Sequence, residues 1–447
     1  MAQAMNNLNK AFTGAIKAIR GELLDFKGVV SNPELLPENV RHVEDGLLLV
    51  EEGRIKWRGS WEEGKNLIPA DAQVYDYRGK FIMPGFIDTH VHFPQLEIIG
   101  SYGEQLLEWL NTYTFPTELK YSRKEYAREM AGIFLKELLR NGTTTALTFC
   151  TVHPQSAEAL FEEADRLNMR LIAGKVMMDR HAPEGLLDTP ETAYSESKAL
   201  IEKWHNHNRL SYVLLPRFAP TSTPEQLEQI MHLKEEYPDC YLQTHLAENQ
   251  NECAWVKDLF PEQRSYLDVY HHYKLTGRRS TFAHCIHLDE EDYRCMEETE
   301  SGIAFCPTSN MFLGSGLFPL RQAQASNVRV GLATDVGAGT SFSMLQTLNE
   351  AYKVMQLQGE KLPPYEGFYL ATMGSAHSLD LDDRLGNFDE GKEADFIVLD
   401  PAATSLQQLR RDNSRTLEEQ LFVLMTLGDD RNIYRTWVNG TPVHERN

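Results

Sequence analysis

Short apolar segments alternate with amphipathic stretches through the middle of the chain. Strands buried on both faces of a parallel sheet are apolar at nearly every position, so each segment is predicted to be such a strand. The stretches between them have the spacing of surface helices, for example at 126–140 and 223–237. The predicted strands cover residues 81–88, 143–149, 170–178, 210–218, 240–245, 280–284, 302–307 and 328–334.

This alternation of strands and helices fits a closed (β/α)8 barrel. The units extend from residue 81 to residue 334, close to the roughly 250 residues that such a barrel takes. A doubly wound open sheet is the alternative, but no Gly-x-Gly-x-x-Gly motif follows the first segment. The pattern therefore predicts an α/β fold with a TIM barrel over residues 81–385.

Both flanks of the predicted barrel are strand-like. Residues 46–61 have the pattern of two strands joined at a Glu-Glu-Gly turn. Residues 391–400 and 434–443 are also strand-like, and the second contains Asn-Gly, a strong hairpin signal. We expect residues 1–80 and 386–447 to form one small β-sandwich domain together; two unrelated edge hairpins are the alternative.

The chain is strongly acidic. Its 447 residues include 65 acidic and 44 basic side chains, a formal net charge of −21. Such a surface repels phosphate backbones and anionic lipids, so we expect a small molecule as partner, and neither nucleic acid nor membrane. Six scattered cysteines without a CxxC pair favour a reducing compartment. No apolar run approaches the ~18 residues of a membrane span, and no secretory signal is evident, so we expect a cytoplasmic protein.

Histidines lie at the carboxyl ends of several predicted strands. The first segment runs into His90 and His92, which are two residues apart and so point to the same face of a strand. The fifth segment ends in His245, the sixth ends in His284, and the eighth runs into Asp335. Barrel enzymes carry their functional groups at this rim. Four imidazoles and a carboxylate there predict a site for a divalent transition metal, zinc first.

Glu248 and Arg217 are candidates for the chemistry beside the metal. Glu248 follows the fifth strand closely, and a carboxylate partly excluded from solvent can accept and return a proton. Stabilisation of a helix N-terminus is its alternative role. Arg217 ends the fourth segment and suits a carbonyl or ring acceptor of a substrate, with a salt bridge as the alternative. His287 is a competing metal ligand to His284, with looser geometry.

Several motifs resemble the amidohydrolase superfamily. They are PGFIDTHVHFPQ (84–95), the pair His245 and Glu248, the strand end at His284, ATD (333–335) and RLGNFDEGKEADFIVLD (384–400). Within that superfamily, four features resemble the members that deaminate guanine: Gln95, LLEWLNTYTFPTE (106–118), PRFAPT (216–221) and FCPTSNMFLGSG (305–316). The likeness covers nearly the whole chain from about Gly46.

The resemblance implies roles for particular residues. The implied zinc ligands are His90, His92, His245, His284 and Asp335. The implied catalytic residues are Glu248, Asp335 and His284, and the implied substrate contacts are His92, Gln95, Arg217, Phe218, His245, Glu248 and Asp335. Phe218 would stack on the purine or simply belong to the barrel core. Related enzymes with two metals have a carboxylated lysine at the fourth strand end, where this chain has Arg217, so one zinc per chain is implied.

The activity implied is hydrolysis of guanine to xanthine and ammonia by a zinc-activated water, in a homodimer. One alternative is a related enzyme that acts on another ring, such as an 8-oxoguanine, cytosine or triazine deaminase or a chlorohydrolase. A non-catalytic barrel scaffold is the alternative from a different class. The complete set of ligands argues against a scaffold, since a scaffold has no physical need for them.

Overall fold

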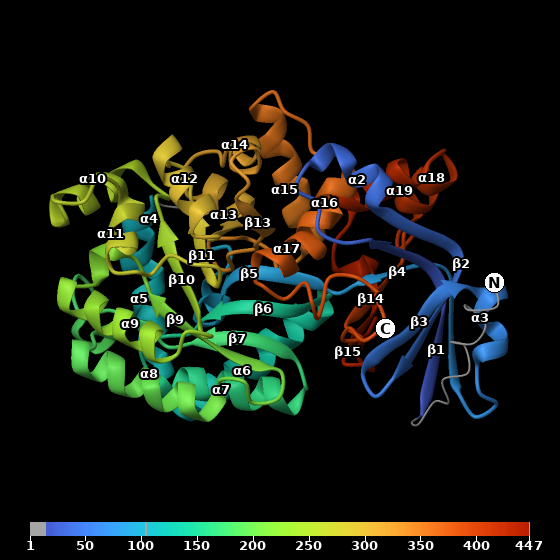
Figure 1. The fold of residues 1–447 in the computed structure, drawn as a ribbon, viewed down its shortest axis with the longest axis horizontal. Coiled ribbons are helices and arrows are strands. Elements are labelled where there is room, and N and C mark those ends of the chain that lie inside the picture. The colour runs from blue at the N-terminus through green and yellow to red at the C-terminus, as the bar shows by residue number, and fades with distance from the viewer. Residues whose placement is uncertain (1–14, 103–104, 447) are drawn as a thin grey trace.

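The computed structural model describes residues 15–102 and 105–446, which form a barrel and a separate mixed sheet (Figure 1). The barrel strands are parallel and follow one another around the sheet in chain order. They are β5 (Phe86–His92), β6 (Thr143–Phe149), β7 (Arg170–Gly174), β9 (Leu210–Pro216), β10 (Tyr241–Leu246), β11 (Ser280–His284), β12 (Gly302–Phe305) and β13 (Arg329–Leu332), and β8 (Val176–Met177) pairs with β9.

The first and last barrel strands meet at a seam, so the barrel is nearly closed. The backbone N–H of Asp335 donates to the carbonyl oxygen of His90 at 2.9 Å, and the N–H of His92 donates to that of Val336 at 2.9 Å. Buried Asp88 reinforces the seam, because it accepts from both the N–H and the hydroxyl of Thr334. The predicted barrel is therefore confirmed in a nearly closed form, and the doubly wound open sheet is excluded.

Helices surround the barrel and cover its outer face (Figure 1). The two helices predicted at 126–140 and 223–237 are confirmed as α6 and α9. The helices are α2 (Leu36–Asn39), α3 (Trp61–Gly64), α4 (Leu106–Trp109), α5 (Phe115–Glu118), α6 (Lys124–Arg140), α7 (Pro154–Arg166), α8 (Pro190–Trp204), α9 (Pro224–Glu236), α10 (Gln250–Leu259), α11 (Tyr266–His272), α12 (Glu290–Glu298), α13 (Pro307–Phe312), α14 (Leu320–Ala325), α15 (Met344–Leu357), α16 (Pro364–Ala371), α17 (Met373–Ser378), α18 (Ser405–Asp412) and α19 (Leu417–Leu427). None of the helices within the described ranges has the length and apolar character needed to cross a membrane.

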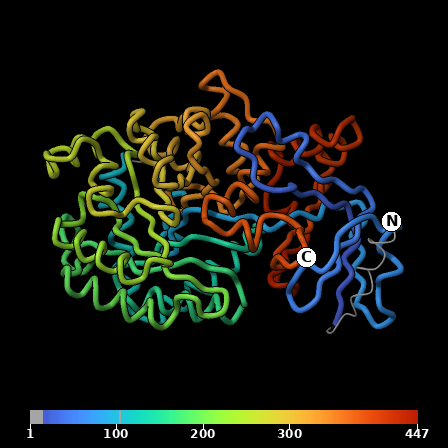
Figure 2. The backbone as a smooth tube through the Cα atoms, in the orientation of Figure 1, coloured from blue at the N-terminus to red at the C-terminus, as the bar shows by residue number. Residues whose placement is uncertain are grey.

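The second sheet is built from both ends of the chain, as predicted. Its order is β16-β15-β14-β4-β1-β2-β3, so the three C-terminal strands lie beside the four N-terminal ones, and β14 pairs with β4 where the two groups meet. Figure 2 shows the corresponding blue and red segments side by side. The strands are β1 (Ile16–Phe26), β2 (Val40–Glu51), β3 (Arg54–Ser60), β4 (Gln73–Pro84), β14 (Phe396–Leu399), β15 (Ile433–Val438) and β16 (Thr441–Glu445). Two unrelated hairpins are therefore excluded, while the domain bounds 1–80, 81–385 and 386–447 stay predictions.

One predicted strand, 81–88, is divided between the two sheets. Its first half belongs to β4, which pairs with β14, and the barrel strand β5 begins only at Phe86. The chain passes from one sheet to the other at Gly85. A Cβ at that position would lie 2.0 Å from Oγ1 of Thr144, so only glycine allows this close approach. Periodicity could not show the division because both halves are buried.

Candidate active site

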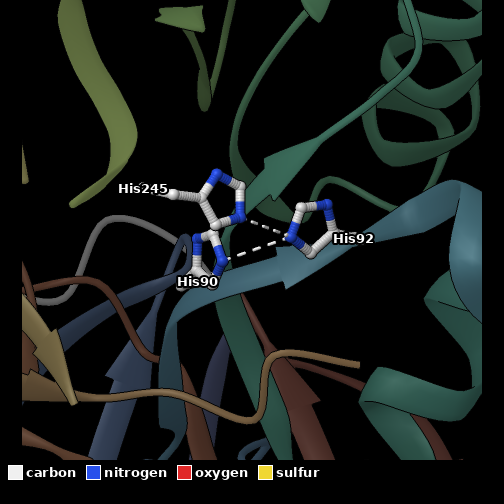
Figure 3. Close-up of side chains that lie close together, drawn as sticks. All are labelled: His90, His92 and His245. Carbon is white, nitrogen blue, oxygen red and sulfur yellow. Dashed lines mark hydrogen bonds between the residues drawn. The ribbon is translucent and has the colours of Figure 1, made fainter. Parts of the chain in front are cut away.

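The five side chains predicted to bind a metal lie together at the carboxyl end of the barrel. His90 and His92 project from β5 and His245 from β10, and Nε2 of His92 lies 3.2 Å from Nε2 of each of the others (Figure 3). Asp335 follows β13, and its Oδ1 lies 3.2 Å from Nε2 of His90 and 3.3 Å from Nε2 of His92. His284 ends β11 and places Nε2 3.8 Å from Oδ2 of Asp335.

Hydrogen bonds on the far side of the imidazole rings fix which nitrogen carries the proton. Nδ1 of His245 donates to the carbonyl oxygen of Arg217 at 2.6 Å. Nδ1 of His90 donates to Oε1 of Gln243 at 2.9 Å, and that amide is oriented because its Nε2 donates to the carbonyl oxygen of Thr89. With Nδ1 protonated, the Nε2 of each neutral ring presents a lone pair to the centre of the cluster.

This donor set fits a divalent cation. The lone pairs of His90 and His245 both face Nε2 of His92, which has at most one proton to donate. His284 donates through Nδ1 to Asn310 at 2.8 Å, and its buried Nε2 has no hydrogen-bond partner in the described part of the chain. Imidazole nitrogens with one carboxylate suit zinc and related metals. A cation at the centre would turn these repulsive contacts into attractive ones.

Burial and mutual repulsion shift the pKa values of the cluster. Burial lowers the pKa of His92 to about 3 and that of His245 well below its usual range, whereas for His90 the effect of burial is outweighed by Asp335, which raises its pKa. Burial alone would raise the pKa of Asp335, but the histidines, His90 first, lower it well below its usual range. Neutral imidazole and ionised carboxylate are the forms that bind a cation.

Glu248 lies beside this cluster, with one oxygen held by a neighbour. Oε1 accepts a hydrogen bond from the hydroxyl of Ser315 at 3.0 Å, and Oε2 lies 3.4 Å from Nε2 of His284. Burial, and then the charge of Asp335, raise the pKa of Glu248 to about 8. Its backbone N–H donates to Oε2 of buried Glu252 at 3.0 Å, which fixes the loop. Glu248 can therefore hold a proton near neutral pH.

A cavity opens over the cluster and Glu248, with about 410 Å³ of space that no protein atom fills, part of it open to solvent. All of the predicted substrate contacts line it, together with apolar residues from the segment that holds α4. The lining residues are His92, Gln95, Leu106, Trp109, Leu110, Arg217, Phe218, His245, Glu248, His284, Leu313, Asp335 and Ala338.

Arg217 faces this cavity and is also half of a buried ion pair. Nη1 donates to both carboxylate oxygens of Glu118, at 2.9 Å and 2.8 Å. The salt bridge considered as an alternative for Arg217 therefore exists, but it occupies only one of three guanidinium nitrogens. Nε and Nη2 donate to no group among the described residues, and they remain for a ligand. Sequence reasoning missed Glu118, although it ends the motif at 106–118.

Gln95 and Phe218 contribute a polar and an apolar part of the cavity wall. Oε1 of Gln95 accepts the backbone N–H of Gly337 at 3.0 Å, so part of the hydrogen-bonding capacity of its amide is already used. Phe218 is 4% exposed and its ring contacts that of Trp255 edge to face. Phe218 therefore both packs in an apolar cluster and faces the cavity.

His287, the competing candidate ligand, and Lys175, a buried lysine on the barrel, both lie outside the cluster. His287 donates through Nε2 to the carbonyl oxygen of Ser315 at 3.1 Å, so it does not compete with His284 as a ligand. Lys175 interrupts the third predicted strand between β7 and β8, and its buried ammonium pairs with Asp188 at 2.9 Å and Glu196 at 2.8 Å. Lys175 is therefore part of a structural ion pair.

The backbone around the site is strained at four positions. Ala247, His284, Cys285 and Asp335 have φ angles of +48°, +74°, +52° and +49°, in the left-handed region that side chains rarely adopt. Such residues cost on the order of 1–3 kcal/mol each and gather at functional sites. Two of these residues, His284 and Asp335, are predicted metal ligands, so the strained backbone directs their side chains toward the cluster.

Known proteins share this architecture and much of the sequence. The model of the amidohydrolase family matches residues 81–443. The chain belongs to the amidohydrolase family. Guanine deaminase from Escherichia coli K12 is 61% identical over 432 residues, which cover 97% of this amidohydrolase and 98% of the relative. The likeness therefore begins well before Gly46, where the motifs alone placed its start.

Two solved structures resemble this amidohydrolase along nearly its whole length. Escherichia coli guanine deaminase has a TM-score of 0.94 with 60% identity, and it covers 97% of this chain and 100% of its own. Guanine deaminase from C. acetobutylicum, with guanine bound in its active site, has a TM-score of 0.86 with 30% identity. The match covers 96% of this chain and 100% of that structure. Family membership and the donor set together support a metal-dependent hydrolase.

Proposed function

We propose that this amidohydrolase converts guanine and water to xanthine and ammonia. The observation that carries the proposal is one buried cavity in which the histidine cluster, the proton carrier Glu248 and the hydrogen-bond donor Arg217 face the same space. Relatives named guanine deaminase, identical at up to 61% of matched positions, support it. Action on another ring, or a scaffold role, has no comparable support.

The metal we propose is a single zinc ion, held by His90, His92, His245, His284 and Asp335. When bound, it would lower the pKa of a water so that a hydroxide nucleophile is available near neutral pH. The arginine at the fourth strand end favours one ion, because it offers no bridging ligand for a second.

The protein groups move the protons of the reaction. Asp335 accepts the proton of the attacking water, and Glu248 gives a proton to the ring nitrogen beside C2 of guanine. The new C–O bond makes C2 tetrahedral, with both oxygen and the amino nitrogen attached. Asp335 returns its proton to that nitrogen, the C–N bond breaks and ammonia leaves, and the C2 hydroxyl gives its proton to Glu248 as the C=O bond of xanthine forms. Ser315 holds one oxygen of Glu248, so the other stays directed toward the reacting atoms.

Arg217 and Gln95 fix the orientation of the ring. The free nitrogens of Arg217 only donate, so they pair with the O6 acceptor of guanine, whereas adenine has an amino donor at that position. The amide of Gln95 reads the adjacent ring edge, and Phe218 covers the ring. Donor facing donor in a buried site costs about 1–3 kcal/mol for each unpaired group. Adenine is therefore refused.

Arg217→Ala is expected to raise KM for guanine and to lower kcat/KM by roughly 10- to 100-fold, the value of a hydrogen bond to a charged group. Metal content should stay unchanged because Arg217 contacts the cluster only through its backbone. Arg321→Ala is the matched control, since Arg321 also pairs with a buried glutamate, Glu366, but far from this cavity. Equal losses of kcat/KM in both variants would refute the role of Arg217.

We also place the protein in the cytoplasm as a homodimer. All six cysteines are free, as is typical of a reducing compartment. The dimer rests on the family likeness alone.

A further inference from the structure

A buried carboxylate holds the arginine of the cavity wall. Glu118 is 1% exposed and accepts two hydrogen bonds from Nη1 of Arg217, at 2.9 Å and 2.8 Å. Burial raises the pKa of Glu118, while Arg217 and then Gln95 act to lower it. Glu118 thus contacts Arg217, which faces the cavity, while it does not itself line the cavity.

The arrangement around Arg217 leaves a defined set of donors free. Glu118 takes Nη1, and the ring of Phe115 lies against the guanidinium, with 5.4 Å between the ring centroid and Cζ. The side chain of Arg217 is only 3% exposed, so solvent does little to screen its charge. Nε and Nη2 are left, and their direction is set by the partner on Nη1.

Glu118 also decides the charge that a ligand meets. A buried guanidinium without a counter-ion attracts an anion strongly, because the low-dielectric surroundings do not screen it. With the carboxylate of Glu118 against it, the pair is neutral as a whole while its free N–H groups still donate. Such a pair favours a neutral acceptor, such as a ring carbonyl, over an anionic one.

We propose that Glu118 is a positioning and specificity-determining residue, which orients Arg217 and makes the cavity select neutral purines over purine anions. This inference rests on the proposed function for the identity of the substrate. The preference between neutral and anionic rings does not depend on the proposed function, because binding affinities alone measure that preference.

The test compares Glu118→Gln with the parent, both loaded with zinc. Urate is an anionic purine at neutral pH, and hypoxanthine is a neutral one. We expect the ratio of the inhibition constants of urate and hypoxanthine to fall about tenfold in Glu118→Gln, because Arg217 loses its counter-ion. We expect KM for guanine to rise about tenfold with a smaller change in kcat, and zinc content to stay the same, because Arg217 is less well oriented.

Two further variants separate this role from a structural one. Glu118→Asp keeps the charge but shortens the side chain. It should therefore retain the parental ratio of the inhibition constants of urate and hypoxanthine, while its KM for guanine is raised as in Glu118→Gln. Glu366→Gln is the matched control, since Glu366 is equally buried and pairs with Arg321 away from the cavity. It should leave the ratio and KM unchanged.

An unchanged urate-to-hypoxanthine ratio in a folded Glu118→Gln protein would overturn the inference, as would the same shift in Glu366→Gln. If Glu118→Gln does not fold, a parental KM in Glu118→Asp would overturn it instead. If the parent does not deaminate guanine, the proposed function fails. Calorimetric affinities for urate and hypoxanthine would then still decide the role of Glu118.

Discussion

Glu248→Gln is expected to lower kcat for guanine by about 10² to 10⁴, the usual value of general acid–base catalysis. Glutamine keeps the size of the side chain and can still accept the hydrogen bond from Ser315, but it cannot take up and return a proton. Because Glu248 is not among the proposed zinc ligands, zinc content should not change. Steady-state kinetics and elemental analysis of the same preparation measure both quantities.

The outcomes of this substitution separate the possible roles of Glu248. Loss of zinc in the variant would mean that Glu248 helps to hold the ion. Activity within about threefold of the parent would mean that another group moves the proton. Glu366→Gln serves as the control, because it makes the same change at a buried carboxylate outside the cavity.

Removal of the metal is expected to abolish turnover and to lower the thermal stability of the protein. Without an ion, Nε2 of His92 lies 3.2 Å from Nε2 of both His90 and His245, and because it has at most one proton to donate, at least one of these contacts sets lone pair against lone pair. An ion that binds only the folded protein stabilises it by about 2.7 kcal/mol when its free concentration is 100 times its dissociation constant. Chelation should therefore lower Tm, and one equivalent of zinc should restore both Tm and activity.

The same prediction can be made for a single ligand. His284→Ala should lose zinc affinity and activity together, while the surrounding barrel still folds. His287→Ala is the matched control, since His287 lies nearby but bonds to Ser315 and not to the cluster. Two equivalents of metal in the parent, or full activity after complete chelation, would contradict the proposed single-ion site.

The strand ends explain why the ligand positions could be predicted from the sequence. His90 and His92 share a face because side chains on a strand alternate, and His245 and His284 end segments whose apolar character marks them as buried strands. Parallel strands of a barrel bring their carboxyl ends to one rim. These three local rules are enough to place four imidazoles near one another.

Features that depend on contacts between distant segments could not be predicted. The strand β1 contains Lys17, Arg20 and Glu22 among its apolar residues, and its place between β2 and β4 depends on pairing with both. The bond between Glu118 and Arg217 joins residues 99 positions apart. Nothing in the local pattern of either segment indicates that pairing.

Glu252 shows the same limit near the site itself. It lies three residues after Asn249, in the usual place of a carboxylate that caps a helix N-terminus, and it does cap α10. The structure adds that Oε2 accepts the N–H of Glu248 and Oε1 accepts the hydroxyl of Tyr266. The first contact fixes the loop of the proton carrier, and the second, from a different helix, holds the carboxylate in position; the spacing alone indicates neither.

The most direct measurement follows the ultraviolet change from guanine to xanthine with purified, zinc-loaded protein, with adenine, cytosine and 8-oxoguanine assayed in parallel. Ammonia release, measured separately, should match the xanthine formed. We expect guanine to have the highest kcat/KM and adenine to be refused, because the free nitrogens of Arg217 can only donate hydrogen bonds. A higher kcat/KM for adenine, cytosine or 8-oxoguanine than for guanine would contradict the proposed function.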